Sequence, residues 1–119
     1  MALAKELVAT GLFVNTAKAV GGSVVTGITA GTTQTQAGAT ALTGAINVVG
    51  TVGTTSDGVI LPVAEVGDSV FVRNAGANTA KVYPPVGGAV NGGTANASVT
   101  LASGASAVYR YVSTVDVVS

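Results

Sequence analysis

The carboxylates are the side chains of this sequence best suited to acid–base chemistry or metal binding. They are Glu6, Asp57, Glu65, Asp68 and Asp116. A two-carboxylate hydrolase needs its pair facing across a substrate cleft, and only Glu65 and Asp68 are close in sequence. Both fall in a predicted turn before a strand, where Asp commonly accepts backbone hydrogen bonds. We therefore interpret these two residues, and Asp57 in Ser56-Asp57-Gly58, as turn residues.

Other kinds of catalytic or metal site are poorly supported. A calcium site made of Asp57, Glu65 and Asp68 would have suitable oxygen ligands, but the spacing does not match a calcium-binding loop. The sequence contains no histidine and no cysteine, so Ser-His-Asp and thiolate catalysis cannot arise within this chain. The pairs Gly87-Gly88 and Gly92-Gly93 do not open a helix as a phosphate-binding loop does. We expect no enzyme activity, no metal and no cofactor.

Tyrosines and arginines are the remaining candidates for recognition. They are Tyr83, Tyr109, Tyr111, Arg73 and Arg110. Together they could line a patch that binds a sugar or a protein, because a tyrosine ring combines an apolar body with a polar hydroxyl. Alternatively, the rings pack between paired strands with their hydroxyls in water, and we favour this second interpretation.

Composition excludes several kinds of partner. The net charge is zero and charged residues make up 8% of the chain, against about 25% in typical soluble domains. The basic residues are scattered, so we expect no nucleic acid binding and no attachment to a membrane surface. The apolar run 7–14 is too short to span a bilayer. It is not interpreted as a signal peptide, because Glu6 lies beside Lys5 and Asn15 ends the run.

Short strands must position these residues, and the clearest pair lies in Gly67–Pro85. In this stretch Val70 and Val72 point to one face and the intervening residues to the other. Asn74–Asn78 contains the residues that turn a chain, and Thr79–Tyr83 alternates again before two prolines. The stretch therefore predicts a β-hairpin.

Further strands are expected along most of the remaining chain, over residues 45–52, 59–61, 97–101 and 106–113. In the last of these Tyr109 and Tyr111 share one face while Val108 and Val112 share the other, and we expect the valine face to be inward. Short strands that recur about every ten residues, with turn signals between them, indicate an all-β fold. We predict a compact small antiparallel sandwich or barrel with an extended N-terminal arm.

We divide the chain into an N-terminal arm over residues 1–30 and a β-sandwich or barrel domain over residues 31–119. Leu12, Phe13 and Val14 in the arm are candidate contact residues, either as a core strand or as an apolar anchor for a neighbouring subunit. Hydrophobic residues make up 48% of the chain but aromatic residues only 4%, so the core consists of small side chains. Such a core leaves a thin margin over chain entropy. We therefore expect oligomerisation or docking on a larger body.

Several short motifs follow one another in a distinctive order between Asp57 and Pro85. Asp57-Gly58-Val59-Ile60-Leu61-Pro62 is followed by Val66–Asn78, in which Gly67-Asp68 precedes Val70 and Val72 and Asn74-Ala75-Gly76-Ala77-Asn78 ends the run. Val82-Tyr83-Pro84-Pro85 comes next. This order resembles small structural proteins of tailed bacteriophages, over roughly the last three-quarters of the chain. The chain departs from similar sequences at its end, where no aromatic residue follows the final strand.

The resemblance implies a virion component. We expect a capsid decoration (cement) protein on the outer capsid surface, assembled in the host bacterial cytoplasm, with the major capsid protein as its partner and a homotrimer as its oligomeric state. The arm would add a strand to an exposed capsid edge. The alternative is a tail- or fibre-associated receptor-binding module, in which Tyr83, Tyr109, Arg73 and Arg110 would line a carbohydrate site.

Overall fold

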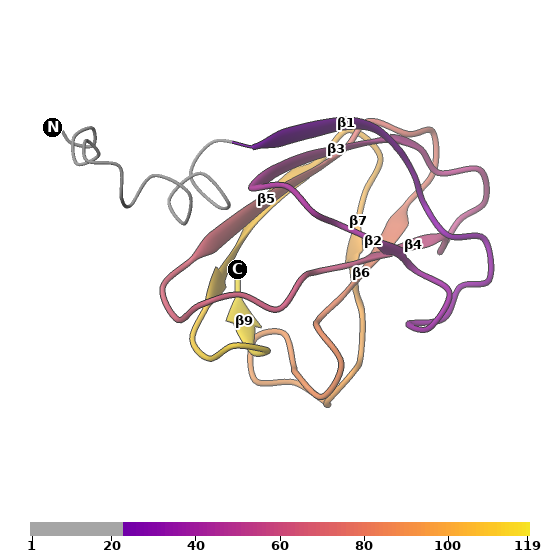
Figure 1. Ribbon diagram of the computed structural model, residues 1–119. Helices are drawn as coiled ribbons and strands as arrows, with labels where there is room; N and C mark the ends of the chain where they lie inside the picture. The colour runs from indigo at the N-terminus through magenta and orange to yellow at the C-terminus, as the bar shows by residue number, and fades with distance from the viewer. Residues whose placement is uncertain (1–22) are drawn as a thin grey trace, which may run out of the picture.

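The computed structural model describes residues 23–119 as nine short strands (Figure 1). The strands are β1 (Val24–Thr29), β2 (Thr40–Ala41), β3 (Ile46–Thr51), β4 (Gly58–Ile60), β5 (Ser69–Asn74), β6 (Ala80–Tyr83), β7 (Val99–Leu101), β8 (Ser106–Tyr111) and β9 (Val117–Val118). Residues 23–119 contain no helix, and so none that could cross a membrane. The candidate contact residues Leu12, Phe13 and Val14 lie outside the described residues.

The strands form two mixed sheets, so the prediction of an antiparallel sandwich or barrel is wrong in strand direction. The five-stranded sheet has the order β1-β3-β5-β8-β9 and the four-stranded sheet the order β2-β4-β6-β7. The neighbours β1, β3 and β5 are parallel, as are β2, β4 and β6. From β1 to β6 successive strands alternate between the two sheets, so over this part the chain returns to each sheet in the same direction. The described part is thus a compact, mostly β fold.

The predicted hairpin in Gly67–Pro85 is also wrong. Both strands exist, as β5 and β6, but β5 pairs with β3 and β8, whereas β6 pairs with β4 and β7. The turn between them carries the chain from one sheet to the other. The buried Asn74 side chain holds this turn, because it accepts from the Gly76 N–H at 2.9 Å and donates to the Leu101 carbonyl of the opposite sheet at 2.9 Å.

The first six strands form three strand–turn–strand units, β1–β2, β3–β4 and β5–β6, which stack on one another. In the five-stranded sheet Val24 lies beside Ile46, and Ile46 beside Phe71. In the four-stranded sheet Thr40 lies beside Val59, and Val59 beside Val82. The antiparallel strands β7 and β8 close the stack after the third unit. The side of β1 away from β3 is an edge of the five-stranded sheet.

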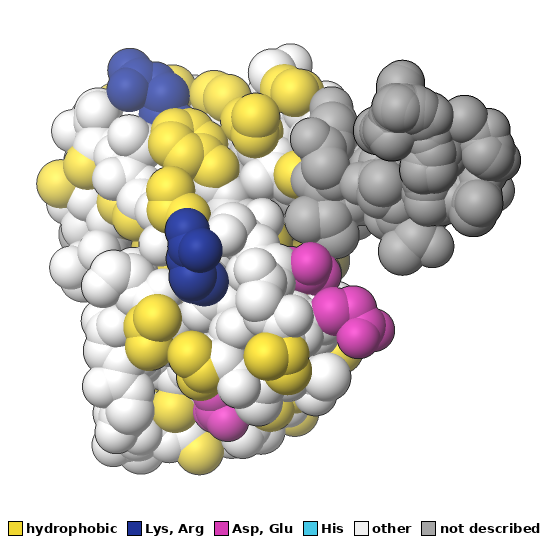
Figure 2. Space-filling view, turned by 90° about the vertical axis from the view of Figure 1, so that its left-hand side faces the viewer, with side chains coloured by type: hydrophobic (Ala, Val, Ile, Leu, Met, Phe, Trp, Pro, Cys, Tyr) yellow, Lys and Arg dark blue, Asp and Glu magenta, His cyan; other side chains and the backbone are white. Residues whose placement is uncertain are grey.

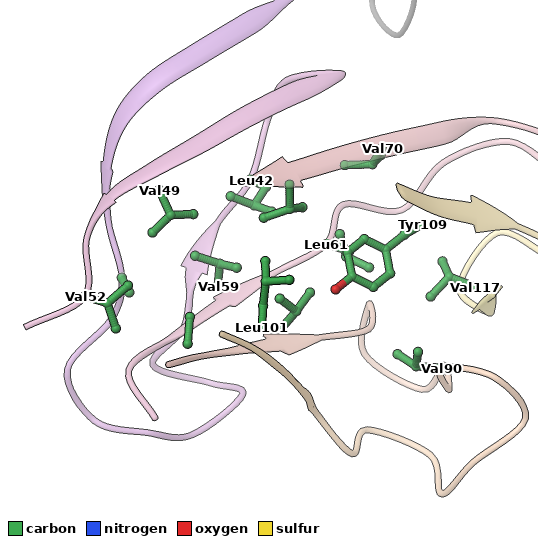
Figure 3. Close-up of a cluster of buried hydrophobic side chains, with 14 of the residues drawn as sticks. Leu42, Val49, Val52, Val59, Leu61, Val70, Val90, Leu101, Tyr109 and Val117 are labelled. Atoms are coloured by element: carbon green, nitrogen blue, oxygen red, sulfur yellow. The ribbon is translucent and has the colours of Figure 1, made fainter. Parts of the chain in front are cut away.

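The core lies between the two sheets and contains Tyr109 and Tyr111. Figure 3 shows Tyr109 among the smaller buried side chains. Tyr109 and Tyr111 are each 1% exposed, whereas Val108 and Val112 are 43% and 57% exposed. The expectation that the valine face of this strand is inward is therefore wrong. The physical reason is size: a tyrosine ring buries far more apolar area than a valine, and the opposing residues are mostly small. The Tyr111 hydroxyl donates to the Pro62 carbonyl, which satisfies its polar end.

The described end of the predicted arm belongs to the sheet. Residues 24–29 of the expected 1–30 arm form β1, which pairs with β3. β1 contains a bulge, because Thr26 and Gly27 lie where β3 has the single residue Val48 between paired positions. Gly27 has a φ of +68°, a backbone conformation that favours glycine.

Candidate docking surface

The outward face of the five-stranded sheet carries a row of apolar side chains. Val24, Ile46, Phe71 and Val108 come from four adjacent strands and are direct cross-strand neighbours. We call these four residues the outer row. Val24, Ile46 and Val108 are 58%, 41% and 43% exposed. A sheet face in contact with water normally carries polar side chains, so this row indicates a contact surface.

The strands themselves explain why the outer row forms. Side chains alternate along each strand, so burial of Asn47, Val72 and Tyr109 turns the residues before them outward. The parallel register of β1, β3 and β5 places Val24, Ile46 and Phe71 side by side, and the antiparallel pairing of β5 with β8 adds Val108. Adjacent strands are about 4.8 Å apart, a spacing at which cross-strand neighbours on one face interact. The fold thus concentrates residues that are dispersed in the sequence.

Two arginines lie on the same outward face. Arg73 is two residues after Phe71 on β5 and pairs with Ser106, and its Nη1 donates to the Gly104 carbonyl at 3.2 Å. Arg110 is two residues after Val108 on β8 and pairs with Ser69. Both arginines are exposed. Figure 2 shows hydrophobic side chains gathered beside basic ones on one side of the molecule.

The described carboxylates lie outside the strands, and those of Asp57, Asp68 and Asp116 accept hydrogen bonds from other loop residues. Asp57 is buried and accepts from the Thr54 N–H at 3.0 Å and from the Gln34 amide. The Asp68 carboxylate accepts from the Glu65 N–H at 3.0 Å. Asp116 accepts from the Ala89 N–H at 2.9 Å. Within residues 23–119 no three acidic side chains come close enough to hold a metal ion, so Asp57, Glu65 and Asp68 do not form the calcium site considered above.

The tyrosines and arginines do not form one patch. Tyr83, Tyr109 and Tyr111 are buried, whereas Arg73 and Arg110 project from the outer face. The interpretation that the tyrosine hydroxyls lie in water is also wrong for Tyr83, whose hydroxyl donates to the Gln34 carbonyl at 3.0 Å, and for Tyr111.

Burial changes how these tyrosines titrate. Desolvation raises the pKa of Tyr109 to about 12. It raises the pKa of Tyr111 further, with a smaller contribution from the negative charge of Asp68. The neutral ring is therefore the stable form of both residues in the folded protein.

The edges of the five-stranded sheet differ in how they are covered. The outer side of β9 bonds to the connection before β7, because the Val117 N–H donates to the Ala89 carbonyl and the Asn91 N–H donates to the Val117 carbonyl. β1 has only β3 as a strand neighbour within residues 23–119. The main chain of Ser23 faces β3, since its carbonyl accepts from Ala45 and Ile46. By alternation, the N–H and C=O of Val24 face the free edge.

Sequence reasoning missed the outer row, although a partial signal was present. Alternation in β5 and β8 separated the two faces of each strand correctly. It did not show that the face of Phe71 and the face of Val108 are the same outward surface, because this depends on strand pairing. Comparison with known proteins adds no candidate residues: no family model matches the chain, and neither a curated protein nor a solved structure matches it.

Proposed function

We propose that this chain is a virion structural protein that decorates the outer surface of a tailed-phage capsid and stabilises contacts between major capsid subunits. The observation that carries the proposal is the outer row, four apolar side chains in register on a solvent-exposed sheet face. The order of sequence motifs from Asp57 to Pro85 supports a virion role. The outer row supports a role in docking.

The physical basis of the docking is burial of the outer row. Covering an exposed valine or isoleucine releases about 25 cal/mol per Å² of apolar surface. A sheet face is flat and rigid, so the row loses little conformational freedom when a partner covers it. The outward face therefore suits attachment to another protein surface.

The two arginines define the chemistry of the capsid surface that fits. Within residues 23–119, Arg73 and Arg110 are the charged residues at outward strand positions of the five-stranded sheet. A complementary surface would present apolar side chains beside carboxylates, since arginine pairs with carboxylate through two parallel hydrogen bonds. Such charge pairs orient the partner and raise the association rate, whereas the apolar row supplies most of the affinity.

Docking would also compensate for a small core. Apart from three tyrosines, the buried hydrophobic residues within 23–119 are valine, leucine and alanine. A partner that binds only the folded state adds stability in proportion to the logarithm of its free concentration over Kd. We expect the protein to melt at a higher temperature on the capsid than in solution.

Copy number in purified particles tests the location. A decoration protein is present in numbers comparable to the capsid subunits, whereas a tail or fibre component is present in far fewer copies. Quantitative mass spectrometry of particles, together with an electron-microscopy map, measures both number and position. Low copy number, or density confined to the tail, contradicts the proposal and favours the tail- or fibre-associated alternative.

A single substitution tests the docking face. Val108→Glu places a charge in the outer row without altering the buried side of β8, and we expect at least ~10-fold weaker binding to heads assembled without the protein. Val86→Glu is the matched control, because Val86 is 73% exposed and lies outside the sheet. Co-sedimentation with the heads measures binding of both variants. Equal binding of V108E and V86E would exclude the outer row as the contact.

A further inference from the structure

One edge of β1 has no strand neighbour within residues 23–119, and we call it the free edge. It is the basis of a second inference, which concerns contact between copies of the chain and does not depend on the capsid proposal. β1 is six residues long and mostly exposed. The edge strands of the four-stranded sheet, β2 and β7, have two and three residues. An edge strand presents unpaired N–H and C=O groups to any strand that fits beside it. The length of β1 makes it the best template for such a strand among the described edges.

The bulge in β1 restricts which strand can fit. Thr26 and Gly27 together occupy the space of one residue of β3, and Gly50 of β3 is left over between the pairs Ile28–Val49 and Thr29–Thr51. A Cβ atom on Gly50 would stand 3.6 Å from the Gly27 Cα. A regular strand placed beside β1 would lose register at this bulge. A strand with glycine at the matching position could repeat the bulge and keep its hydrogen bonds.

The chain contains such a segment. Val8-Ala9-Thr10-Gly11-Leu12 repeats the pattern of Val24-Val25-Thr26-Gly27-Ile28, with the Thr-Gly pair at the same place. In parallel register, Gly11 would continue the Gly27–Gly50 column and Val8 would add a fifth member to the outer row. Parallel pairing is also the mode that joins β1 to β3 and β3 to β5.

The length of the connection indicates that the segment comes from a second copy. Residues 29–45 link Ile28 to Ile46 and pass through the four-stranded sheet on the way. Only residues 13–23 link Leu12 to Val24, which is fewer than the stacked units use. A shorter connection favours an antiparallel hairpin, and that arrangement would not align Gly11 with the bulge.

We propose that Val8–Leu12 of one copy adds to the free edge of β1 in a second copy, as a parallel strand in register with Val24–Ile28. Each copy then donates one strand and accepts one. A contact of this heterologous kind forms a closed ring when the rotation between copies permits.

Cysteine cross-linking tests this pairing cleanly, because the natural sequence has no cysteine. In the proposed register Thr10 lies beside Thr26 of the other copy, and neighbouring strands are about 5 Å apart, within reach of a disulfide. Full-length Thr10→Cys and Thr26→Cys variants are mixed, allowed to assemble and oxidised. We expect a covalent dimer that contains one chain of each variant.

The matched control is Thr94→Cys in place of Thr26→Cys. Thr94 is exposed in the connection before β7, which lies against β9 at the opposite edge of the sheet. Equal cross-linking of Thr10→Cys to both partners would overturn the proposal. An intramolecular disulfide in a chain that carries both T10C and T26C, with no covalent dimer, would show own-chain pairing and would also overturn it.

Light scattering of the full-length chain gives an independent result. We expect an oligomer for the natural sequence and a monomer for Ala9→Pro, because in the proposed register the Ala9 N–H donates to the Val24 carbonyl and proline cannot donate a ladder hydrogen bond. Thr16→Pro, outside the repeated segment, should remain oligomeric. A monomeric natural chain would refute the second-copy contact while leaving the capsid proposal to its own tests.

Discussion

Replacing Asn74 with alanine should destabilise the fold more than its place in a turn would indicate. The Asn74 side chain is fully buried and bonds to three backbone groups. It accepts from Gly76 N–H and donates to the carbonyls of Asn78 and Leu101, each at 2.9 Å. Leu101 belongs to the four-stranded sheet, so this one side chain joins β5 to the sheet opposite.

The expected loss follows from the backbone groups left without a partner. The bonds to Gly76 and Leu101 are buried, and an unsatisfied buried group costs about 1–3 kcal/mol. The bond to Asn78 is part-buried and contributes less. We expect Asn74→Ala to lower the free energy of unfolding by about 3–5 kcal/mol, a large part of the ~5–15 kcal/mol of a typical domain.

Urea unfolding followed by circular dichroism measures this loss as a lower midpoint with little change in slope. Asn78→Ala is the control, because the Asn78 side chain donates one bond, to Val52 O at 2.7 Å, and is half-buried. That control should lose about 1 kcal/mol. Equal losses in the two variants would refute the reasoning that Asn74 holds the two sheets together.

Two further predictions concern the core and the loops. The folded-state pKa of Tyr109 is raised from 10.0 to about 12, so its contribution to stability is full below pH 10.0 and is lost as pH rises through about 12. In a Tyr83→Phe variant, in which Tyr109 and Tyr111 are the tyrosines left, alkaline unfolding should therefore coincide with the rise of tyrosinate absorbance. Tyrosinate formation in that variant while it stays folded at pH 10.0 would contradict this. Gly88→Ala should destabilise by more than ~2 kcal/mol, because its Cβ would lie 1.8 Å from the Val115 carbonyl oxygen, a clash the backbone must move to relieve. Gly53→Ala is the control, because its Cβ would meet only the Asp57 carboxylate at 3.8 Å. Thermal unfolding should show a much lower midpoint for Gly88→Ala and little change for Gly53→Ala. Equal midpoints of the two variants would show that the Gly88 backbone relaxes freely.

Local patterns determined the strands and their faces. The alternation in residues 69–74 put Val70 and Val72 on one side and Phe71 and Arg73 on the other, and the structure confirms this division. Turn-forming residues ended the strands near Asn74 and Pro84. These features were predictable because alternation and turn preference depend on residues close in the chain.

The partner of each strand was decided by tertiary structure. An asparagine- and glycine-rich turn such as residues 74–78 suits both a hairpin and a crossing between sheets, since both need the same backbone conformations. The choice depends on the distant Leu101 carbonyl, which the Asn74 amide binds. The same holds for β8, where alternation separated tyrosines from valines but only the space between the sheets determined that the tyrosines are inward.

The candidate docking face shows the same limit. Composition alone indicated that a chain without histidine or cysteine, and with few charges, would act through contact surfaces. Val24, Ile46, Phe71 and Val108 are far apart in sequence, and each resembles an ordinary strand residue. They become one surface only because parallel pairing aligns β1, β3 and β5 and antiparallel pairing places Val108 of β8 beside Phe71. The sequence by itself determined which side chains of a strand share a face, because side chains alternate along the strand. Pairing between distant strands decided which of these side chains lie next to one another in the folded protein.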